Sequence, residues 1–449
     1  MMVETIRKLL HREAWHNINK IIAKLYPADI AQIMQALSEE EMYTLFARIT
    51  DIDKAAETLS ELEVTVATEL LTNLPEEHTI RLLKAMSQDD AADLLAQLPE
   101  DFSQRLLEKL GVKQSQEIET LLSYADDTAG GIMTTEFFAL PENLTVGDAI
   151  SAIRKRGGEA ETVFYIYVVD QRGHLVGIIS LRKLILSQPD TRLQQIMNSN
   201  VVKVNVHTDQ EIVAQLVEKY NILAIPVVDD ENKLVGIVTV DDVIDVIRQE
   251  ATEDIFKMVG TDYTEIVYAD KIWKIARIRL PWLITNLIGG VVTGYLMWLF
   301  KITIEHVLAL ITFVPVITGM GGNVGTQSSS IVVRGLATGR VTADNLGHII
   351  WREARIGILM GLICGLAVGL IALAWHREPL LGLVVAIAMS ASMTIAASMG
   401  AITPMVFNRL QIDPAIASGP FVTTSNDIIG ILVYMGTATL FLKYVFTGM

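Results

Sequence analysis

Long apolar runs dominate the second part of the chain. Five of them are long enough to cross a bilayer as helices, which takes roughly 20 residues each. The predicted spans are residues 279–300, 307–333, 353–375, 380–407 and 415–442. Basic side chains concentrate on one side of these spans, at Arg277, Arg334 and Arg409 among others. The positive-inside rule then places residues 1–272 in the cytoplasm and the C-terminus outside.

Residues 1–128 show a different pattern, with short amphipathic segments separated by Pro, Ser or Gly. Three consecutive units of twelve residues, 75–86, 87–98 and 99–110, each open on Pro or Ser, continue with acidic residues and then reach a Leu-Leu pair. This period predicts short helices stacked as a superhelix. Acids at helix starts usually serve as caps and as partners of the helix dipole. This role is the simplest interpretation of each of Asp89, Asp90 and Asp93.

Residues 130–250 contain an internal repeat. The segment Ile132-Met133-Thr134 is echoed by Ile196-Met197-Asn198, and Leu175-Val-Gly-Ile-Ile-Ser180 by Leu234-Val-Gly-Ile-Val-Thr239. Each copy predicts a strand, a helix, two strands around a turn and a final helix. The pattern resembles a tandem pair of CBS modules, at residues 129–190 and 191–250.

The resemblance to CBS pairs implies ATP or another adenine nucleotide as a candidate ligand. The acid that such modules use for ribose is expected a few residues after the Ser or Thr. The second copy has Asp241 and Asp242 after Thr239, whereas the first has Arg182 and Lys183 after Ser180. Arg182 is therefore a candidate phosphate contact, and nucleotide binding remains open.

Charge is distributed unevenly. Residues 1–272 carry 46 acidic and 25 basic side chains, a net of −21, whereas residues 273–449 carry a net of +5. An acidic surface repels nucleic acid and attracts cations, so no nucleic-acid partner is expected. The acids are dense just before an amphipathic connecting helix predicted at residues 251–274, which Thr252 can cap. They form either a solvated face or a divalent-cation site.

One carboxylate, Asp427, lies inside the fifth apolar run, beside the oxygen-bearing residues 423–426. An ionisable group at membrane depth costs a few kcal/mol and usually faces a water-filled path. Oxygen ligands suit a hard cation such as Mg²⁺, although a polar contact between helices is the simpler alternative. In the second run, Asn323 and Gln327 are four residues apart on one helical face. Gly419 and Pro420 predict a break in the helix before Asp427.

These motifs together resemble the MgtE family of magnesium channels and transporters. They are Gly-Gly-Asn323-Val-Gly-Thr-Gln327, Asp241-Asp242-Val-Ile-Asp245, Glu250-Ala-Thr-Glu253-Asp254 and Asp413-Pro-Ala before Asp427. The resemblance implies an acidic helical N domain, tandem CBS domains of α+β fold, a connecting "plug" helix and a transmembrane domain with five helices at 275–449. It also implies a homodimer in the inner membrane, with a pore on its two-fold axis lined by the second and fifth spans.

The resemblance also assigns roles to individual residues. Asp427 matches the pore aspartate that holds Mg²⁺, while Asn323, Gln327, Gly419 and Thr423 line the pore. A second set matches acids that sense cytosolic Mg²⁺ and close the pore: Asp89, Asp90, Asp93, Asp242, Asp245, Glu250, Glu253 and Asp254. Two alternatives stay open: transport of Co²⁺, Ni²⁺ or Mn²⁺ on the same scaffold, and a membrane-anchored CBS nucleotide sensor without transport. No catalytic motif stands out, so an enzyme is not expected.

Overall fold

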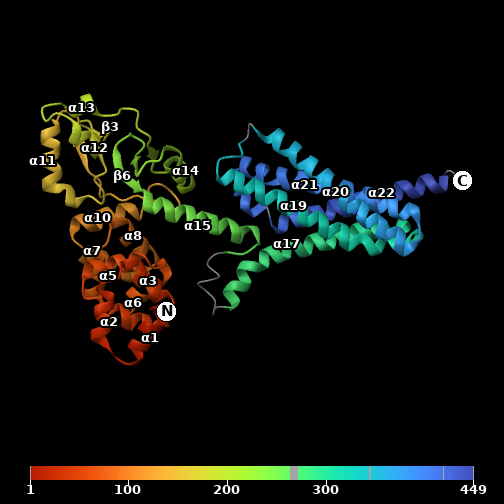
Figure 1. Ribbon diagram of the computed structural model, residues 1–449, viewed down its shortest axis with the longest axis horizontal. Helices are drawn as coiled ribbons and strands as arrows, with labels where there is room; N and C mark the ends of the chain where they lie inside the picture. Colours follow the sequence, from red (N-terminus) through yellow and green to blue (C-terminus); the bar gives the residue numbers. More distant parts are fainter. Residues whose placement is uncertain (1, 263–271, 343–344, 418, 448–449) are drawn as a thin grey trace. The chain divides into compact units, whose positions relative to one another are not determined.

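The computed structural model describes residues 2–262, 272–342, 345–417 and 419–447. The chain divides into two compact units, Met1–Ile247 and Arg248–Met449, and each is described by itself (Figure 1).

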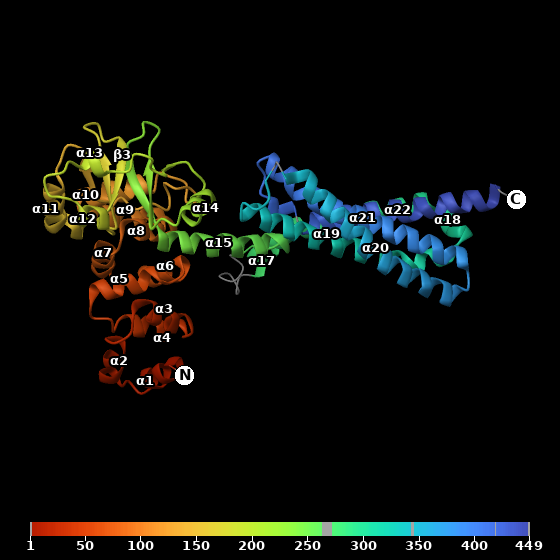
Figure 2. The same ribbon diagram turned by 45° about the horizontal axis from the view of Figure 1, so that its top comes forward.

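The first unit begins with a stack of short helices, whose pairs form successive tiers (Figure 2). Helices three, five, seven and nine pack in one layer, and helices six, eight and ten in the other. The twelve-residue period predicted from the sequence is confirmed, because consecutive helices begin at Glu76, Gln88 and Glu100. The helices are α1 (Met2–His11), α2 (Trp15–Ile22), α3 (Pro27–Gln35), α4 (Glu39–Phe46), α5 (Ile52–Ser60), α6 (Val64–Thr72), α7 (Glu76–Ala85), α8 (Gln88–Gln97), α9 (Glu100–Lys109) and α10 (Val112–Leu121).

Two modules of the same topology follow, as the repeat predicted. In each, the first strand runs parallel to the second and the second antiparallel to the third, with a bulge at the equivalent position. The first module has β1 (Ala139–Pro141), α11 (Val146–Arg156), η1 (Gly157–Glu159), β2 (Tyr165–Val169), β3 (Leu175–Ser180) and α12 (Leu181–Leu186). The second has α13 (Leu193–Ile196), β4 (Val204–Asn205), α14 (Gln210–Tyr220), β5 (Ala224–Val228), β6 (Leu234–Thr239) and α15 (Val240–Met258).

The two Ile-Met motifs form packing contacts between the two modules. Met133, near the start of the first module, packs on Gly236 of β6 in the second, and Met197, near the start of the second, packs on Gly177 of β3 in the first. At both glycines a Cβ atom would come within 2.5 Å of the methionine sulfur, so the strand position requires glycine. One apolar core continues from the stacked helices into the second module, which makes the first unit a single packed body.

The second unit contains five helices, within the described residues, that are long and apolar enough to cross a membrane. The predicted five-helix membrane domain is confirmed. Its elements are α17 (Ile272–Leu299), α18 (Lys301–His306), η2 (Leu308–Phe313), α19 (Val314–Ala337), α20 (Leu346–His376), α21 (Pro379–Arg409), η4 (Pro414–Ala417) and α22 (Pro420–Thr447).

Three details differ from the sequence prediction. The fifth spanning helix begins at Pro420 rather than near residue 415, because proline is well suited to the first turn of a helix and η4 precedes it. Thr252 does not cap a helix: its hydroxyl donates to the Arg248 carbonyl inside α15, which continues from Val240. Of the connecting segment predicted at 251–274, residues 263–271 lie outside the described part of the chain.

Candidate functional site

The first set of predicted site residues lies on α19. Asn323 and Gln327 are exposed, whereas Val324, Gly325 and Ser328 between and beside them are buried. The two amides therefore form one polar stripe that points away from the interior of this unit. At membrane depth such a stripe requires water, an ion or another protein surface beside it.

The second set lies on α22, which packs against α19. Thr423 and Asp427 are one turn apart and half-buried. The Thr423 hydroxyl lies 3.5 Å from that of Thr326, and its methyl group would meet a Cβ atom at Gly322. The two polar stripes therefore belong to neighbouring helices, and Gly322 lets those helices approach closely.

Two polar neighbours of Asp427 in the sequence point elsewhere. The Thr424 hydroxyl donates to Asn286 Oδ1 on α17, at 2.8 Å. Asn426 is 2% exposed and packs on Gly325, where a Cβ atom would lie 1.8 Å from its amide nitrogen. No hydrogen-bond partner for the Asn426 amide is found among the described residues. Helical geometry separates these side chains from Asp427, although all of them bear oxygen.

Gly419 immediately precedes α22. Its carbonyl accepts a hydrogen bond from the Thr423 amide at 3.2 Å and from the Thr423 hydroxyl at 3.3 Å. These bonds tie Gly419 to the start of the helix that carries Asp427.

A further carboxylate of the membrane unit, Glu353 on α20, bonds to two side chains of the same unit. It is 2% exposed, accepts from the Ser328 hydroxyl at 2.9 Å and pairs with Arg352 at 2.9 Å. Glu353 therefore anchors α20 to the buried face of α19.

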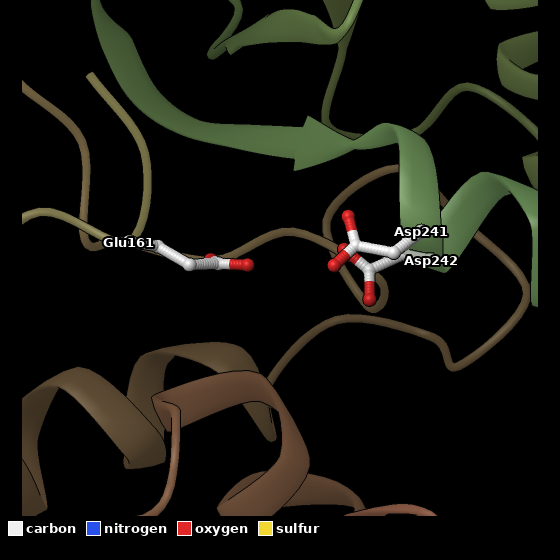
Figure 3. Close-up of side chains that lie close together, drawn as sticks. All are labelled: Glu161, Asp241 and Asp242. Carbon is white, nitrogen blue, oxygen red and sulfur yellow. The ribbon is translucent and has the colours of Figure 1, made fainter. Parts of the chain in front are cut away.

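The first unit contains a separate acidic cluster (Figure 3). Glu161 lies in the loop before β2, and Asp241 and Asp242 lie in the first turn of α15. One carboxylate oxygen from each lies within 4.8 Å of the others, a spacing that could hold a metal ion. The Glu161 amide donates to the Glu136 carbonyl at 2.9 Å, and Asp242 accepts from the Thr239 hydroxyl at 2.5 Å. The loop and the helix start thus converge.

The predicted acids of α8 border this cluster. Asp89 is 8% exposed, and no hydrogen-bond partner for its Oδ1 atom is found in the described part of the chain. Its charge acts on both Asp242 and Glu161. Asp90 faces a cavity of about 370 Å³, lined also by Glu57, Lys84 and Glu136. A buried carboxylate oxygen without a partner is costly unless a cation satisfies it, so these residues fit a cation site.

Burial and mutual repulsion raise the pKa values of these acids. Burial, then the charge of Asp89, raises the pKa of Asp242 to about 8. Burial and the charges of Asp89 and Asp242 raise the pKa of Glu161 to about 8. Burial and Asp90 raise the pKa of Asp93 to about 7. A divalent cation would favour the ionised forms, so proton release accompanies its binding.

The structure separates the predicted sensor acids into two groups. Asp89, Asp90, Asp93, Asp242 and Asp245 belong to the first unit, and Asp245 raises the pKa of Glu61 there, after burial. Glu250, Glu253 and Asp254 belong to the second unit. Sequence reasoning missed Glu161, which no motif marks because a loop carries it.

Arg182, the candidate phosphate contact, is exposed in the first turn of α12. It occupies the position that Asp241 has in the second module. The two modules thus present opposite charges at equivalent helix starts.

These features define the class: a multi-pass membrane protein that joins a helical N domain and a CBS pair to a five-helix membrane domain. Residues 314–437 match the MgtE family, described as a divalent cation transporter, residues 25–127 match the MgtE intracellular N domain, and residues 129–189 and 193–249 match the CBS domain. The chain belongs to the MgtE family.

Individual relatives agree with this assignment. The chain is 37% identical to the magnesium transporter MgtE of Bacillus subtilis, over 95% of this chain and 94% of the relative. It is 38% identical to the magnesium transporter MgtE of Thermus thermophilus, over 95% of this chain and 96% of the relative. A crystal structure of the cytosolic domain of the Mg²⁺ channel MgtE in complex with ATP covers 54% of this chain and 99% of its own, at 38% identity and a TM-score of 0.52.

Proposed function

We propose that this protein conducts Mg²⁺ across the inner membrane, down the electrochemical gradient, through a pore lined by α19 and α22. The single observation that carries the proposal is that Asp427 and Thr423 lie on α22, which packs against α19, the apolar helix that carries the exposed stripe of Asn323 and Gln327. Mg²⁺ keeps much of its water and is often held by few carboxylates, so one Asp427 per subunit is adequate. Relatives that align over nearly the whole chain are named magnesium transporters.

The driving force needs no ATP hydrolysis. A membrane potential that is negative inside supplies about 2 kcal/mol per charge per 100 mV, and Mg²⁺ carries two charges. In this proposal residues 1–272 face the cytoplasm and the C-terminus lies outside, as the positive-inside rule predicts from the distribution of basic residues.

A homodimer completes the proposed pore. Only 6% of the apolar window of α17 is buried within this chain, and the stripe on α19 also faces outward. Large apolar side chains are exposed on α14 and α15 of the second CBS module as well. A second copy can cover these surfaces, which include Ile212, Tyr220, Ile244 and Ile247.

Cytosolic Mg²⁺ regulates the proposed pore through the acidic cluster. At low Mg²⁺ the carboxylates of Asp89, Asp242 and Glu161 repel one another, and Mg²⁺ binding removes that repulsion. Because binding favours the arrangement in which the acids approach, rising Mg²⁺ shifts the population toward that arrangement, which we assign to the closed pore. The remaining predicted sensor acids act in the same sense: Asp90, Asp93, Asp245, Glu250, Glu253 and Asp254.

The CBS pair supplies a second proposed ligand site, for ATP or another adenine nucleotide. The related cytosolic domain binds ATP. In this chain Lys183 stands where the first module would carry a ribose-binding acid, so Arg182 is expected to contribute through phosphate. An Arg182→Ala variant should bind ATP more weakly in equilibrium dialysis.

The test of the pore is Mg²⁺ flux into proteoliposomes. Asp427→Asn keeps the size of the side chain but removes its charge, so we expect uptake to fall by at least about tenfold. Glu378→Gln, which removes an exposed acid at the start of α21, is the matched control and should transport normally. Normal uptake by Asp427→Asn would show that the pore is assigned wrongly.

Two further results would select the alternatives. Faster uptake of Co²⁺, Ni²⁺ or Mn²⁺ than of Mg²⁺ would reassign the cargo. No cation uptake by folded, dimeric protein would favour a nucleotide sensor without transport.

A further inference from the structure

The C-terminal end of α15 contacts the η4 segment (residues 413–417) within the second unit. Lys257 Nζ lies 2.6 Å from Asp413 Oδ2 and also pairs with Glu253. The side chains of Lys257 and Asp413 are 29% and 31% exposed, so the ion pair is partly withdrawn from water. Such a pair is less screened by salt than one on an open surface.

The other oxygen of Asp413 holds the η4 segment itself. Asp413 Oδ1 accepts a hydrogen bond from the Ala415 amide at 2.8 Å, at the start of η4. Asp413 therefore links Lys257 directly to the backbone that leads into α22.

A close backbone contact lies beside the ion pair. A Cβ atom at Gly419 would come within 2.1 Å of the Met258 carbonyl, so the end of α15 lies directly against the residue before α22. Gly260, with φ +75°, turns the chain after α15 and packs on Pro420 and Trp282. The end of α15 and the turn after it therefore contact the chain that leads into α22, through one ion pair at Asp413 and through steric contacts at Gly419 and Pro420.

Lys257 is a permanent cation in acidic surroundings. Burial lowers its pKa, but hydrogen bonds to Asp413 and Glu253 outweigh burial and raise it above the ordinary value. Burial, then Asp413 and Glu250, raises the pKa of nearby Asp254 to about 6, while Lys257 and Arg334 oppose that shift. The ammonium group therefore supplies a positive charge that does not depend on the concentration of Mg²⁺.

We propose that Lys257 is a positioning residue that couples α15 to the pore helix α22 by holding the η4 segment against the end of α15. The proposal rests on the Mg²⁺-regulated transport proposed above. If the link is rigid, a displacement of α15 also displaces the start of α22. Asp427, two turns further along α22, then moves as well. Lys257 thus transmits the regulatory signal through its ion pair with Asp413.

The test compares Mg²⁺ uptake at low and high internal Mg²⁺ in proteoliposomes. In Lys257→Met the link is lost, so high internal Mg²⁺ should inhibit uptake much less, with the inhibition ratio falling roughly 5- to 50-fold. Uptake at low internal Mg²⁺ should stay near that of the unsubstituted protein. Lys257→Arg keeps the charge and should retain inhibition, and Arg248→Met, at an exposed position of the same helix, is the matched control.

The partner residue supplies a second variant. Asp413→Asn can still accept the Ala415 amide but pairs weakly with an ammonium group. Asp413→Asn should lower the inhibition ratio as Lys257→Met does. The inhibition ratio of the double variant should be no lower than that of either single variant.

Opposite results would overturn the proposal. If Lys257 competes with Mg²⁺, uptake by Lys257→Met will be inhibited at a lower internal Mg²⁺ concentration than uptake by the unsubstituted protein. An unchanged inhibition curve would also exclude a coupling role.

Hydrogen exchange separates this proposal from the proposed regulation. In full-length protein, the amides of the η4 segment should exchange faster in Lys257→Met than in Arg248→Met. If uptake by the unsubstituted protein does not change with internal Mg²⁺, the proposed regulation is wrong. The exchange rates still decide whether Lys257 holds the η4 segment. Equal exchange rates in the two variants would show that it does not.

Discussion

At the scale of residues, the acids of this chain differ according to what surrounds each carboxylate. Asp427 lies at membrane depth among uncharged polar groups on α19 and α22. Asp242 lies close to Asp89 and Glu161, and burial together with the charge of Asp89 raises its pKa to about 8. Glu353 has its partners inside the fold, in Ser328 and Arg352. Carboxylates of this chain thus have three different surroundings, decided by neighbours distant in the sequence.

The repulsion at Asp242 is testable by a neutral replacement. In chelator at about pH 8, Asp242→Asn removes a partly buried charge that is repelled by Asp89, which should stabilise the protein by on the order of 1–2 kcal/mol. The Thr239 hydroxyl keeps an acceptor, so the start of α15 is preserved. We expect a higher unfolding temperature in chelator and a smaller increase on adding Mg²⁺.

Asp190→Asn, at an exposed loop position, is the control for this substitution. It should leave the unfolding temperature unchanged both in chelator and with Mg²⁺. A lower unfolding temperature for Asp242→Asn in chelator would mean that the ionised carboxylate stabilises the fold and that the cluster is not strained by repulsion.

At the scale of elements, small residues set the contacts between the membrane helices. Along α20, Gly357, Gly361, Gly365 and Gly369 are buried at four-residue intervals against α21. A Cβ atom at Gly361 would come within 2.7 Å of the Ser390 carbonyl, and the Ser390 hydroxyl donates to the Gly361 carbonyl at 2.8 Å. This backbone contact explains why α20 and α21 form a tight antiparallel pair.

Gly361→Ala should therefore destabilise the membrane unit, because backbone atoms of Ser390 would have to move. The expected cost is about 1–3 kcal/mol, in the range for overpacking a core. Gly347→Ala, on the same helix but with open space around it, should be neutral or stabilising. Unfolding temperatures in detergent check both, and equal temperatures would contradict the close approach.

At the scale of the whole molecule, the raised pKa values of the acids couple stability to pH, and the proposed cation site would couple it to Mg²⁺ as well. Asp93, Glu161 and Asp242 have folded-state pKa values of about 7 to 8, above the ordinary values of 3.8 to 4.5. The folded state therefore binds more protons than the unfolded state between about pH 4 and pH 8. Stability is present at the acidic end of this window and is lost as pH rises through the folded-state values.

We expect the unfolding temperature in chelator to fall between about pH 6 and pH 8, and Mg²⁺ to reverse most of that loss. Near pH 7, Mg²⁺ binding should also release protons. Titration calorimetry in two buffers of different ionisation enthalpy measures that release. A stability that rises with pH over this window, or binding without proton release, would contradict the arrangement of the cluster.

The sequence alone determined the order of the domains and the kind of each element. Hydrophobic runs, the twelve-residue period and the echoed Ile-Met and Leu-Val-Gly motifs are local patterns, and each follows from the burial needs of its own helix or strand. Asp427, Asn323 and Gln327 were found in the same way, because a polar group in an apolar run is visible without any tertiary information.

Only the tertiary structure decided which residues meet. Glu161 joins Asp241 and Asp242 through a loop that no motif marks, and Asn426 faces Gly325 while its neighbour Asp427 lies on another face of α22. Lys257 reaches Asp413 across 156 positions of sequence. Such contacts depend on how packed elements place side chains in space, and no periodicity along the chain encodes that placement.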